Sequence, residues 1–499
     1  MSFNKKVLCL GNNTSDTDDQ TRRVANKNLA ICYGAINELK ELDLGYYHSS
    51  VYDVEFGTLL DIIKQFDTLI ILDQSWSDPD VIRQTVELAN LAESMITVEW
   101  MNESYKINSL FFKNLVETNK SFCIFPFIEL LVQNGSTTVC CRSMKPITQL
   151  DKLQEWSTDP EYKKIRDKML SGELIPDRCQ VCYDYETKGI ISPRQSGTVQ
   201  WANRLGLTSI NDVLQVKTPA YYEVRASNTC NLQCRMCDPA NSNLIEKEYI
   251  KIGLHDSNTT YKYSDFNFIN FDNLKSLYVA GGEPSAMPEL YEFLEKCIAT
   301  NNVDFDFTIN TNAVKFSSKL KNLFAHFTNL QFIVSIDGYQ QVNHYVRWPS
   351  DWDTIIENIH YLIKHGHNVI LQTVVSIWSI SKLHKLLKFI DSEFPGVIMH
   401  GLLVQSEADI LSPFNFPDAV SIKNNLYQIR ELHCYKNDLV FKEFINGLIN
   451  YFNQPAPIDN QKLKQFFKFN DKLDQSRNIQ LKDYIPELEE YRNRCYNKV

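Results

Sequence analysis

The strongest constraint on the fold is a regular alternation of short apolar runs with amphipathic segments between residues 221 and 404. Short runs rich in β-branched and aromatic residues predict strands, and apolar residues recurring every three to four positions predict helices. Strands that alternate with helices form right-handed βαβ units and a parallel sheet. The expected strands are Tyr221–Ser227, Lys275–Ala280, Asp304–Ile309, Leu330–Ile336, Asn368–Val375 and Val397–Val404, with helices near 288–300, 316–326, 352–366 and 381–391.

Polar residues stand where these strands end. Gly281–Pro284 follows the second strand, Asn310–Asn312 closes the third, and Ser335–Gly338 closes the fourth. In barrels built from parallel strands, the carboxyl ends meet at one face, and the chemistry takes place there. Each polar residue also has an ordinary interpretation, as a hydrogen bond at a strand end or a helix cap.

Three of the thirteen cysteines follow the first strand, with the spacing CxxxCxxC: Cys230, Cys234 and Cys237. Clustered cysteines in a reducing compartment bind metal or perform redox chemistry more often than they form disulfides. Three thiolates on one loop suit a [4Fe–4S] cluster that leaves one iron open, because the closed form takes four protein ligands. A structural zinc site would need a fourth ligand nearby, and the adjacent sequence offers no His or further Cys.

The cysteine loop and the strand-end motifs together resemble the radical S-adenosylmethionine (SAM) superfamily. The resemblance covers about 215–410 and implies a partial (β/α)6 TIM-like barrel. It implies a [4Fe–4S] cluster that binds SAM at the three cysteines and cleaves it reductively to a 5′-deoxyadenosyl radical, which abstracts hydrogen from a substrate.

The same resemblance assigns further residues to SAM. Gly281, Gly282 and Glu283 match the family's GGE motif, whose carboxylate receives the methionyl amino group. Glycines let a backbone approach a ligand closely, and a carboxylate accepts ammonium hydrogens. The candidates for contacting the ribose, the methionine part or the carboxylate of SAM are Asn310, Asn312, Ser335, Asp337 and Arg347. The asparagine that the family often has after strand five has no match in Gln372–Ser376, and no residue is assigned as catalytic.

A second cysteine group precedes the barrel. Cys123, Gly135 and Cys140 have the spacing Cys-x(11)-Gly-x(4)-Cys, and a CxxC follows at Cys179 and Cys182. Asn134-Gly135 favours a tight hairpin turn between strands at Phe127–Val132 and Thr137–Cys140. The segment from Leu153 to Gly172 is expected to be helical.

This second group is similar to the SPASM or twitch auxiliary-cluster fold, as in twitch domain-containing radical SAM proteins with an N-terminal twitch domain. It implies that Cys123, Cys140, Cys179 and Cys182 hold a second [4Fe–4S] cluster. Four cysteines also suit zinc. Cys141 could replace Cys140, and because adjacent side chains on a strand point to opposite faces, only one of the two should bind.

The other segments carry weaker signals. Residues 1–105 are expected to form a small α/β domain, with strands at Val7–Leu10 and Asp67–Leu72 and helices near 20–40 and 78–94. The polar residues 11–19 favour a loop that caps the next helix over a ligand loop. The auxiliary domain is assigned to 106–205, and residues 416–499 are expected to form a helical C-terminal extension.

Composition limits the partners. The chain has 499 residues, 51 Lys+Arg against 61 Asp+Glu and a net charge of −10, which argues against broad binding to nucleic acid. No apolar stretch approaches the ~18 residues of a membrane span, and Val7–Leu10 is too short for a secretory signal, so we expect a cytoplasmic protein without membrane contact.

The family resemblance implies a low-potential electron donor, such as flavodoxin or ferredoxin. It favours a peptide as the substrate and leaves open a small molecule or sugar. The alternative without catalysis is a binding module in which both cysteine groups bind structural metal. In that case the purified protein should be colourless and loaded with zinc, whereas iron–sulfur clusters would make it brown.

Overall fold

A computed structural model describes the backbone of Val7–Leu10, Thr68–Ile71, Thr97–Trp100 and Glu103–Lys106, and of residues 110–497 except 144, 154, 188–191, 257–260, 405–408 and 455–457. The expected helices near 20–40 and 78–94 and the loop at 11–19 lie outside these residues. The chain divides into two compact units: unit 1 holds Met1–Ile128 and Ser157–Lys217, and unit 2 holds Glu129–Trp156 and Thr218–Val499.

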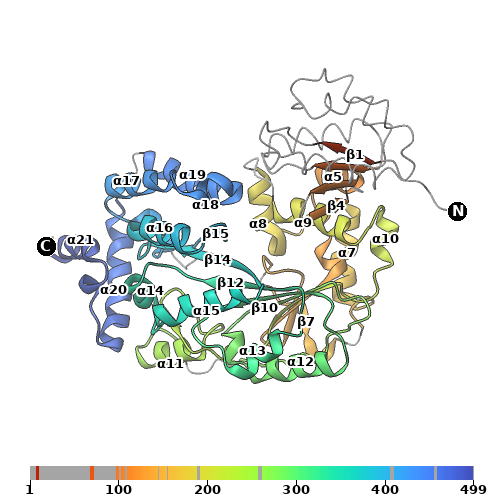
Figure 1. The fold of residues 1–499 in the computed structure, drawn as a ribbon, viewed down its shortest axis with the longest axis horizontal. Coiled ribbons are helices and arrows are strands. Elements are labelled where there is room, and N and C mark those ends of the chain that lie inside the picture. Colours follow the sequence, from red (N-terminus) through yellow and green to blue (C-terminus); the bar gives the residue numbers. More distant parts are fainter. Residues whose placement is uncertain are drawn as a thin grey trace, which may run out of the picture. The chain divides into compact units, whose positions relative to one another are not determined.

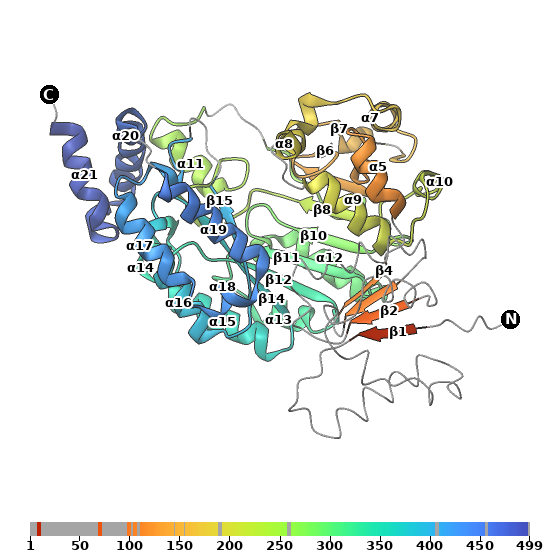
Figure 2. The same ribbon diagram turned by 90° about the horizontal axis from the view of Figure 1, so that it is seen from above.

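Unit 2 is built on a nine-stranded sheet of order β15-β14-β12-β11-β10-β8-β5-β6-β7. Figure 2 shows β8 to β14 side by side, in the order that the alternation of strands and helices predicts. Six consecutive strands pair in parallel, which confirms the predicted βαβ units and gives a largely parallel sheet of the partial-barrel kind. These strands are β8 (Tyr221–Arg225), β10 (Ser276–Val279), β11 (Asp306–Thr311), β12 (Leu330–Ser335), β14 (Asn368–Val375) and β15 (Ile398–Leu403).

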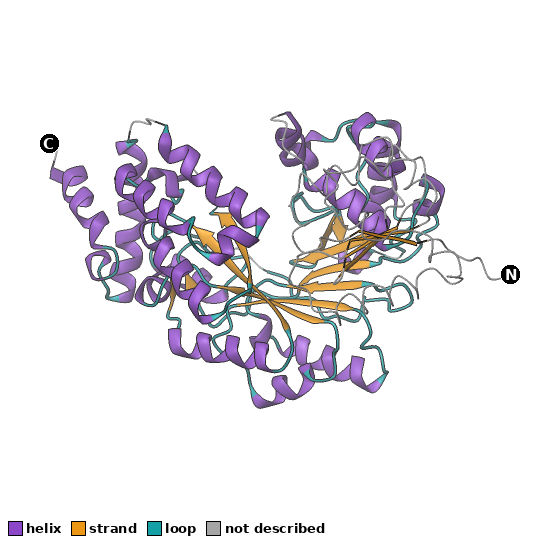
Figure 3. Ribbon diagram, turned by 45° about the horizontal axis from the view of Figure 1, so that its top comes forward, coloured by secondary structure: helices purple, strands orange, loops and turns teal. Residues whose placement is uncertain are grey.

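The two faces of this sheet differ sharply. One face is fully buried, because the helices between the strands cover it (Figures 1 and 3). Its side chains include Leu277, Val279, Phe307 and Phe332, each 0% exposed. On the opposite, inner face, alternate residues such as Tyr278 are only partly buried and polar. A strand presents successive side chains to opposite faces, so this pattern separates an apolar face from a more polar inner face. The covering helices are α11 (Asn243–Lys251), α12 (Pro288–Ala299), α13 (Ser318–Phe324), α14 (Gln341–Val346), α15 (Trp352–Lys364) and α16 (Leu383–Glu393).

The predicted hairpin extends the same sheet. β5 (Glu129–Gln133) pairs in parallel with β8, and β6 (Ser136–Thr138) returns antiparallel to β5 and pairs with β7 (Thr148–Gln149). Asn134 and Gly135 have φ of 52° and 67°, as a two-residue hairpin turn requires. The hairpin residues therefore belong to unit 2 and continue the barrel sheet by one parallel strand.

Three local predictions in this region are wrong. Phe127 lies in the short helix α6 (Phe125–Ile128), so the strand begins only at Glu129. The helix expected from Leu153 begins at Pro160, because Asp159 caps it through the backbone N–H groups of Glu161 and Tyr162. β6 ends at Thr138, so Cys140 and Cys141 lie in the following turn, and the expected alternation of strand faces does not apply to them.

Helices complete unit 2 after β15, and α19 packs against that strand. Their bounds are α17 (Ala419–Ile429), α18 (His433–Asn437), α19 (Leu439–Asn453), α20 (Asn460–Arg477) and α21 (Pro486–Asn497). None of the helices in the described part of the chain combines the length and the apolar content that a bilayer crossing needs.

Unit 1 contains a four-stranded sheet, in which β1, β2 and β3 pair in parallel and β4 is antiparallel to β3. Strands β1 and β2 lie within the two strands predicted for residues 1–105. The unit consists of β1 (Val7–Leu10), β2 (Thr68–Ile71), β3 (Thr97–Trp100), β4 (Glu103–Lys106), α5 (Leu110–Thr118), α6, α7 (Pro160–Ser171), α8 (Pro176–Thr187), α9 (Pro193–Arg204) and α10 (Ile210–Leu214).

Candidate functional site

The CxxxCxxC loop of unit 2 is fixed by a small sheet of its own. Strand β9 (Gln233–Cys234) pairs antiparallel with β13 (Arg347–Trp348), which places Cys234 opposite Arg347. The next backbone N–H, that of Arg235, donates to the carbonyl of Val346 at 2.8 Å. The loop after the first barrel strand and the segment after the fourth are thereby held together.

The three thiols of this loop lie within electrostatic reach of one another. Burial raises the pKa of Cys230 to about 12, and the nearby Cys234 adds to the shift. Burial also raises the pKa of Cys237 well above its ordinary value, with further contributions from Cys234 and Cys230. The thiols are therefore protonated in the metal-free protein, and iron binding must displace their protons.

The surroundings of the thiols fit an anionic group. Arg347 and Arg477 both act electrostatically on Cys234, and each keeps a buried N–H without a hydrogen-bond partner, at Nε of Arg347 and at one terminal nitrogen of Arg477. Orphaned buried donors are costly and call for an acceptor. No group of three or more His, Cys, Asp or Glu among the described residues is arranged to hold a metal ion. In a [4Fe–4S] cluster each thiolate binds a different iron, so these sulfurs need not converge on one point.

Glu283 lies in the interior, at the end of the second barrel strand. Its side chain is 1% exposed. One carboxylate oxygen accepts from the Thr311 hydroxyl at 2.6 Å and from Ser285, and the other accepts from the backbone N–H of Asn312 at 2.7 Å. The carboxylate thus ties the GGE turn to the end of β11, and its contact with the amino group of SAM stays a prediction.

Gly282 is required by close packing against the cysteine loop. Its φ is +50°, and a Cβ there would lie 2.2 Å from the carbonyl oxygen of Thr229, the residue before Cys230. The Thr229 carbonyl also accepts from the N–H of Glu283 at 2.8 Å. The GGE turn therefore sets the position of the first cysteine.

We expect Gly282→Ala to push the Thr229 carbonyl aside and to weaken SAM binding at least tenfold, with destabilisation of about 1–3 kcal/mol. Gly253→Ala is the matched control: its φ is +70°, but nothing lies within 4 Å of the added Cβ. Calorimetric titration with SAM and urea unfolding compare the two variants. Equal SAM affinity in both would show that backbone strain, and not displacement of the cysteine loop, is all that Gly282→Ala causes.

The remaining predicted SAM residues form two groups. Asp337 is 0% exposed and pairs with Arg347 at 2.7 Å, and its other oxygen accepts from the N–H of Val374. Burial lowers the pKa of Arg347, but Cys234 and Asp337 outweigh that effect and raise it. This pair links the ends of β12 and β14 to the cysteine loop.

The second group is a row across three strands. The Asn310 amide donates to the Tyr278 hydroxyl at 2.9 Å, and the Ser335 hydroxyl donates to Asn310 at 3.2 Å. The amide of Asn312 donates instead to Asn231, next to Cys230, at 2.7 Å. The structure therefore brings the predicted residues together around the cysteine loop. The structure adds Tyr278 to this set. The alternation of side chains along the second strand could have predicted that Tyr278 shares a face with these residues.

The sequence reasoning also missed a buried network that joins α20 to the cysteine loop. Arg235 is 0% exposed, donates to the carbonyl of Tyr345, and pairs with Asp474 at 2.5 Å and with Asn470 at 3.1 Å. Three residues after Asp474 on the same helix, Arg477 pairs with Glu248 of α11 at 2.6 Å. These partners lie more than 200 positions apart in the chain, so no local pattern could reveal them.

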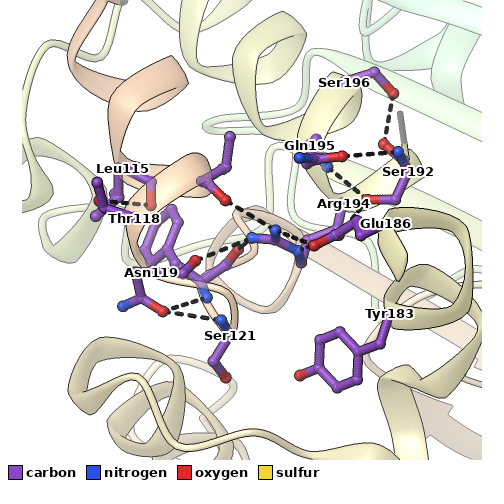
Figure 4. Close-up of polar contacts among 12 residues, drawn as sticks. Leu115, Thr118, Asn119, Ser121, Tyr183, Glu186, Ser192, Arg194, Gln195 and Ser196 are labelled. Atoms are coloured by element: carbon purple, nitrogen blue, oxygen red, sulfur yellow. Dashed lines mark hydrogen bonds and ion pairs between the residues drawn. The ribbon is translucent and has the colours of Figure 1, made fainter. Parts of the chain in front are cut away.

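In unit 1, three cysteines of the second group lie near one another. Burial raises the pKa of Cys123, and Cys179 and Cys182 raise it further. The segment before Cys123 is held by Arg194, which is 2% exposed, donates to the Phe122 carbonyl at 2.6 Å and pairs with Glu186 at 2.8 Å. Figure 4 shows Arg194 between Glu186 and the loop with Asn119 and Ser121. Cys140 belongs to the hairpin part of unit 2, so its role as a fourth ligand stays a prediction.

A buried carboxyl on the inner face of the unit 2 sheet escaped sequence reasoning as well. Glu129 of β5 is 1% exposed, and no hydrogen bond to its carboxyl group occurs among the described residues. Burial raises its pKa well above the ordinary value, and the nearby Glu223 raises it further, whereas Arg225 lowers it. Glu129 is therefore protonated in the folded protein at pH values where it ionises in the unfolded chain.

The raised pKa of Glu129 predicts how stability changes with pH. Because the unfolded acid ionises above its ordinary pKa of 4.5 while the folded one stays neutral, the contribution of Glu129 to the free energy of unfolding falls as the pH rises. Glu129→Gln removes this loss, so its stability advantage should grow by up to about 1.4 kcal/mol per pH unit. Urea unfolding at pH 5, 6.5 and 8 checks this, with the exposed Glu295→Gln as control. An advantage that does not change with pH would contradict the assignment.

Comparison with known proteins identifies one domain. Residues 224–390 match the family model described as Radical SAM superfamily, so this part of unit 2 is a radical SAM domain. No curated protein matches the chain.

Several solved structures match part of the chain at low similarity. SuiB of Streptococcus suis with bound S-adenosylmethionine is 15% identical, with a TM-score of 0.28 over 49% of this chain and 53% of that chain. Native anSMEcpe with bound AdoMet is 14% identical, with a TM-score of 0.32 over 46% and 62%. The methyltransferase TsrM of Kitasatospora setae, with cobalamin and a [4Fe-4S] cluster bound, is 8% identical, with a TM-score of 0.27 over 80% and 75%. The chain thus spans about half to three-fifths of the first two proteins.

Proposed function

Since residues 224–390 form a radical SAM domain, we propose that the chain is an enzyme that cleaves SAM reductively and abstracts a hydrogen atom from a substrate. Cys230, Cys234 and Cys237 would hold the [4Fe–4S] cluster, which supplies the electron for breaking the C–S bond of SAM. The observation that carries the proposal is the proximity of the three thiols to one another, to the GGE turn and to two orphaned arginine donors.

The chain's own residues position the reactants. Arg347, fixed by Asp337, offers its unpartnered Nε–H to an anionic group, and the SAM carboxylate is a suitable acceptor. Asn310 and Ser335 lie in the hydrogen-bonded row of the inner face, where we place the ribose or the methionine part of SAM. Glu283 and Gly282 keep the turn at the close approach that these contacts need.

The test is anaerobic reconstitution with iron and sulfide, followed by reduction in the presence of SAM. We expect a brown protein that releases 5′-deoxyadenosine and methionine. A colourless, zinc-loaded protein that leaves SAM intact under strong reductant would reject the proposal in favour of a metal-stabilised binding module.

For the second cysteine group we propose an auxiliary [4Fe–4S] cluster. The mutual effects of Cys123, Cys179 and Cys182 support it, with Cys140 as the fourth ligand expected from the sequence. Iron and zinc quantitation distinguishes the two metals: about eight iron atoms per chain are expected with two clusters, and about four iron atoms with one zinc would assign the second group to zinc.

A peptide is the proposed substrate class, and a low-potential donor such as flavodoxin or ferredoxin is the proposed electron source. The substrate class follows from the resemblance of the second cysteine group to twitch-type enzymes, and the electron source follows from the resemblance to the radical SAM superfamily. A short precursor gene next to the coding gene would favour a peptide, and surrounding biosynthetic genes would favour a small molecule or sugar.

A further inference from the structure

The inner face of the sheet continues beyond the expected SAM residues toward its β5 edge. Tyr278, which receives the hydrogen bond of Asn310, is paired across the ladder with Glu223. Strand β5 follows on the other side of β8, with Glu129 opposite Tyr221 and Gln133 opposite Arg225. Paired residues and every second residue share a face, so Glu129, Glu223 and Arg225 face the same way as Tyr278.

A single arginine on this part of the face serves two carboxyl groups. Arg225 donates to one oxygen of Glu223 through two nitrogens, at 2.8 and 3.0 Å, and to Gln133 at 3.4 Å. That pair forms without Glu129, for which the described residues provide neither a hydrogen-bond partner nor a second cation. One arginine therefore faces two carboxyl groups, and burial of an unpaired carboxyl is costly.

The neighbours of Glu129 can accommodate a cation. Two aromatic side chains lie beside these carboxyl groups: Tyr221 is within electrostatic reach of both Glu129 and Glu223, and Tyr278 is within reach of Glu223. Tyrosine rings attract alkylammonium groups through the negative face of the ring. Cys141, in the turn after β6, is another ionisable neighbour: Glu223 and Glu129 raise the pKa of its thiol, and Arg142 and Arg225 lower it.

We propose that Glu129, together with Glu223 and the two tyrosines, binds a positively charged alkylammonium group of the substrate. This inference rests on the proposed function, because it places that group on the same face as the expected SAM residues. When the group binds, Glu129 gives up its proton to solvent and forms an ion pair with the ammonium, so the face gains a partner for the buried carboxylate and stays neutral overall.

The proposal is tested with n-butylamine as the probe and 1-butanol as its uncharged counterpart. Saturation-transfer NMR is recorded on the reconstituted protein with SAM at 0.3 M NaCl, where exposed ion pairs are largely screened. We expect transfer to butylamine but not to butanol. We also expect Glu129→Gln to reduce the butylamine signal at least fivefold, and Glu295→Gln, on the outer helix α12 with a side chain 48% exposed, to leave it unchanged.

Equal transfer to both probes, or a full butylamine signal in Glu129→Gln, would overturn the proposal. If Glu129→Gln does not fold, the comparison of the two probes on the natural protein decides alone. The release of 5′-deoxyadenosine in the same samples reports on the proposed function separately. Intact SAM cleavage without selective amine binding removes only the subsite, whereas absent cleavage in the natural protein removes the function.

Discussion

Cys230→Ser is expected to abolish SAM cleavage, with a loss of at least about 1000-fold, equivalent to roughly 4 kcal/mol of barrier. Serine is a poor iron ligand compared with thiolate, so the variant should also lose about four iron atoms per chain. Cys230 is only partly buried, and its replacement should cost little stability. Iron content and 5′-deoxyadenosine release, measured on the same reconstituted sample, check the prediction.

Cys297→Ala is the matched control for loss of a thiol. Cys297 is 0% exposed on α12 and lies on the apolar side of the sheet. Its removal should leave both the iron content and SAM cleavage at the level of the natural protein. Should Cys230→Ser keep its iron while Cys297→Ala loses it, the assignment of the cysteine loop as the cluster site would be wrong.

The second large effect is expected from Asp474→Ala in α20. This change leaves Arg235, which is 0% exposed, without its carboxylate partner, and it also removes an acceptor of the Tyr345 hydroxyl. Breaking a buried ion pair by removing one partner costs about 3–5 kcal/mol. Because Arg235 lies between Cys234 and Cys237, we expect the variant to lose cluster occupancy as well as stability.

A second salt bridge of the same helix provides the control. Lys462 pairs with Asp409 at 3.1 Å, with side chains 35% and 60% exposed, so Lys462→Ala should cost less than about 1 kcal/mol. Urea unfolding and iron quantitation compare the two variants. If Asp474 has a purely structural role, Asp474→Ala will lower stability but leave the iron content per folded chain unchanged. Asp474→Asn keeps a hydrogen-bond acceptor, so it should recover part of the stability and part of the iron content.

The barrel could be predicted from the sequence because its signals are local. The runs around Asp306–Thr311 and Asn368–Val375 carry their own strand pattern, and the turn at Asn134 and Gly135 needs only two residues to form. The cysteine spacing and the GGE motif are local as well. Each of these features could therefore be located to within a few residues.

The buried polar groups that were missed depend on distant partners. The role of Arg235 depends on Asp474, and the position of Glu129 depends on the pairing of β5 with β8, 92 positions away in the chain. The start of α7 was misplaced for a different reason. Asp159 and Pro160 form a strong cap and first turn, and this signal should have outweighed the apolar residues before them.

The pairing of β5 with β8 also affects how the protein can be divided for study. A fragment that began at Thr218 would expose the backbone N–H and C=O groups of Tyr221–Arg225 along an open edge, because β5 normally occupies that edge. Unpaired edges of this kind promote aggregation. Residues 224–390, although they suffice for recognition of the family, are therefore not an autonomous folding unit, and a shortened version for expression must retain the hairpin that starts at Glu129.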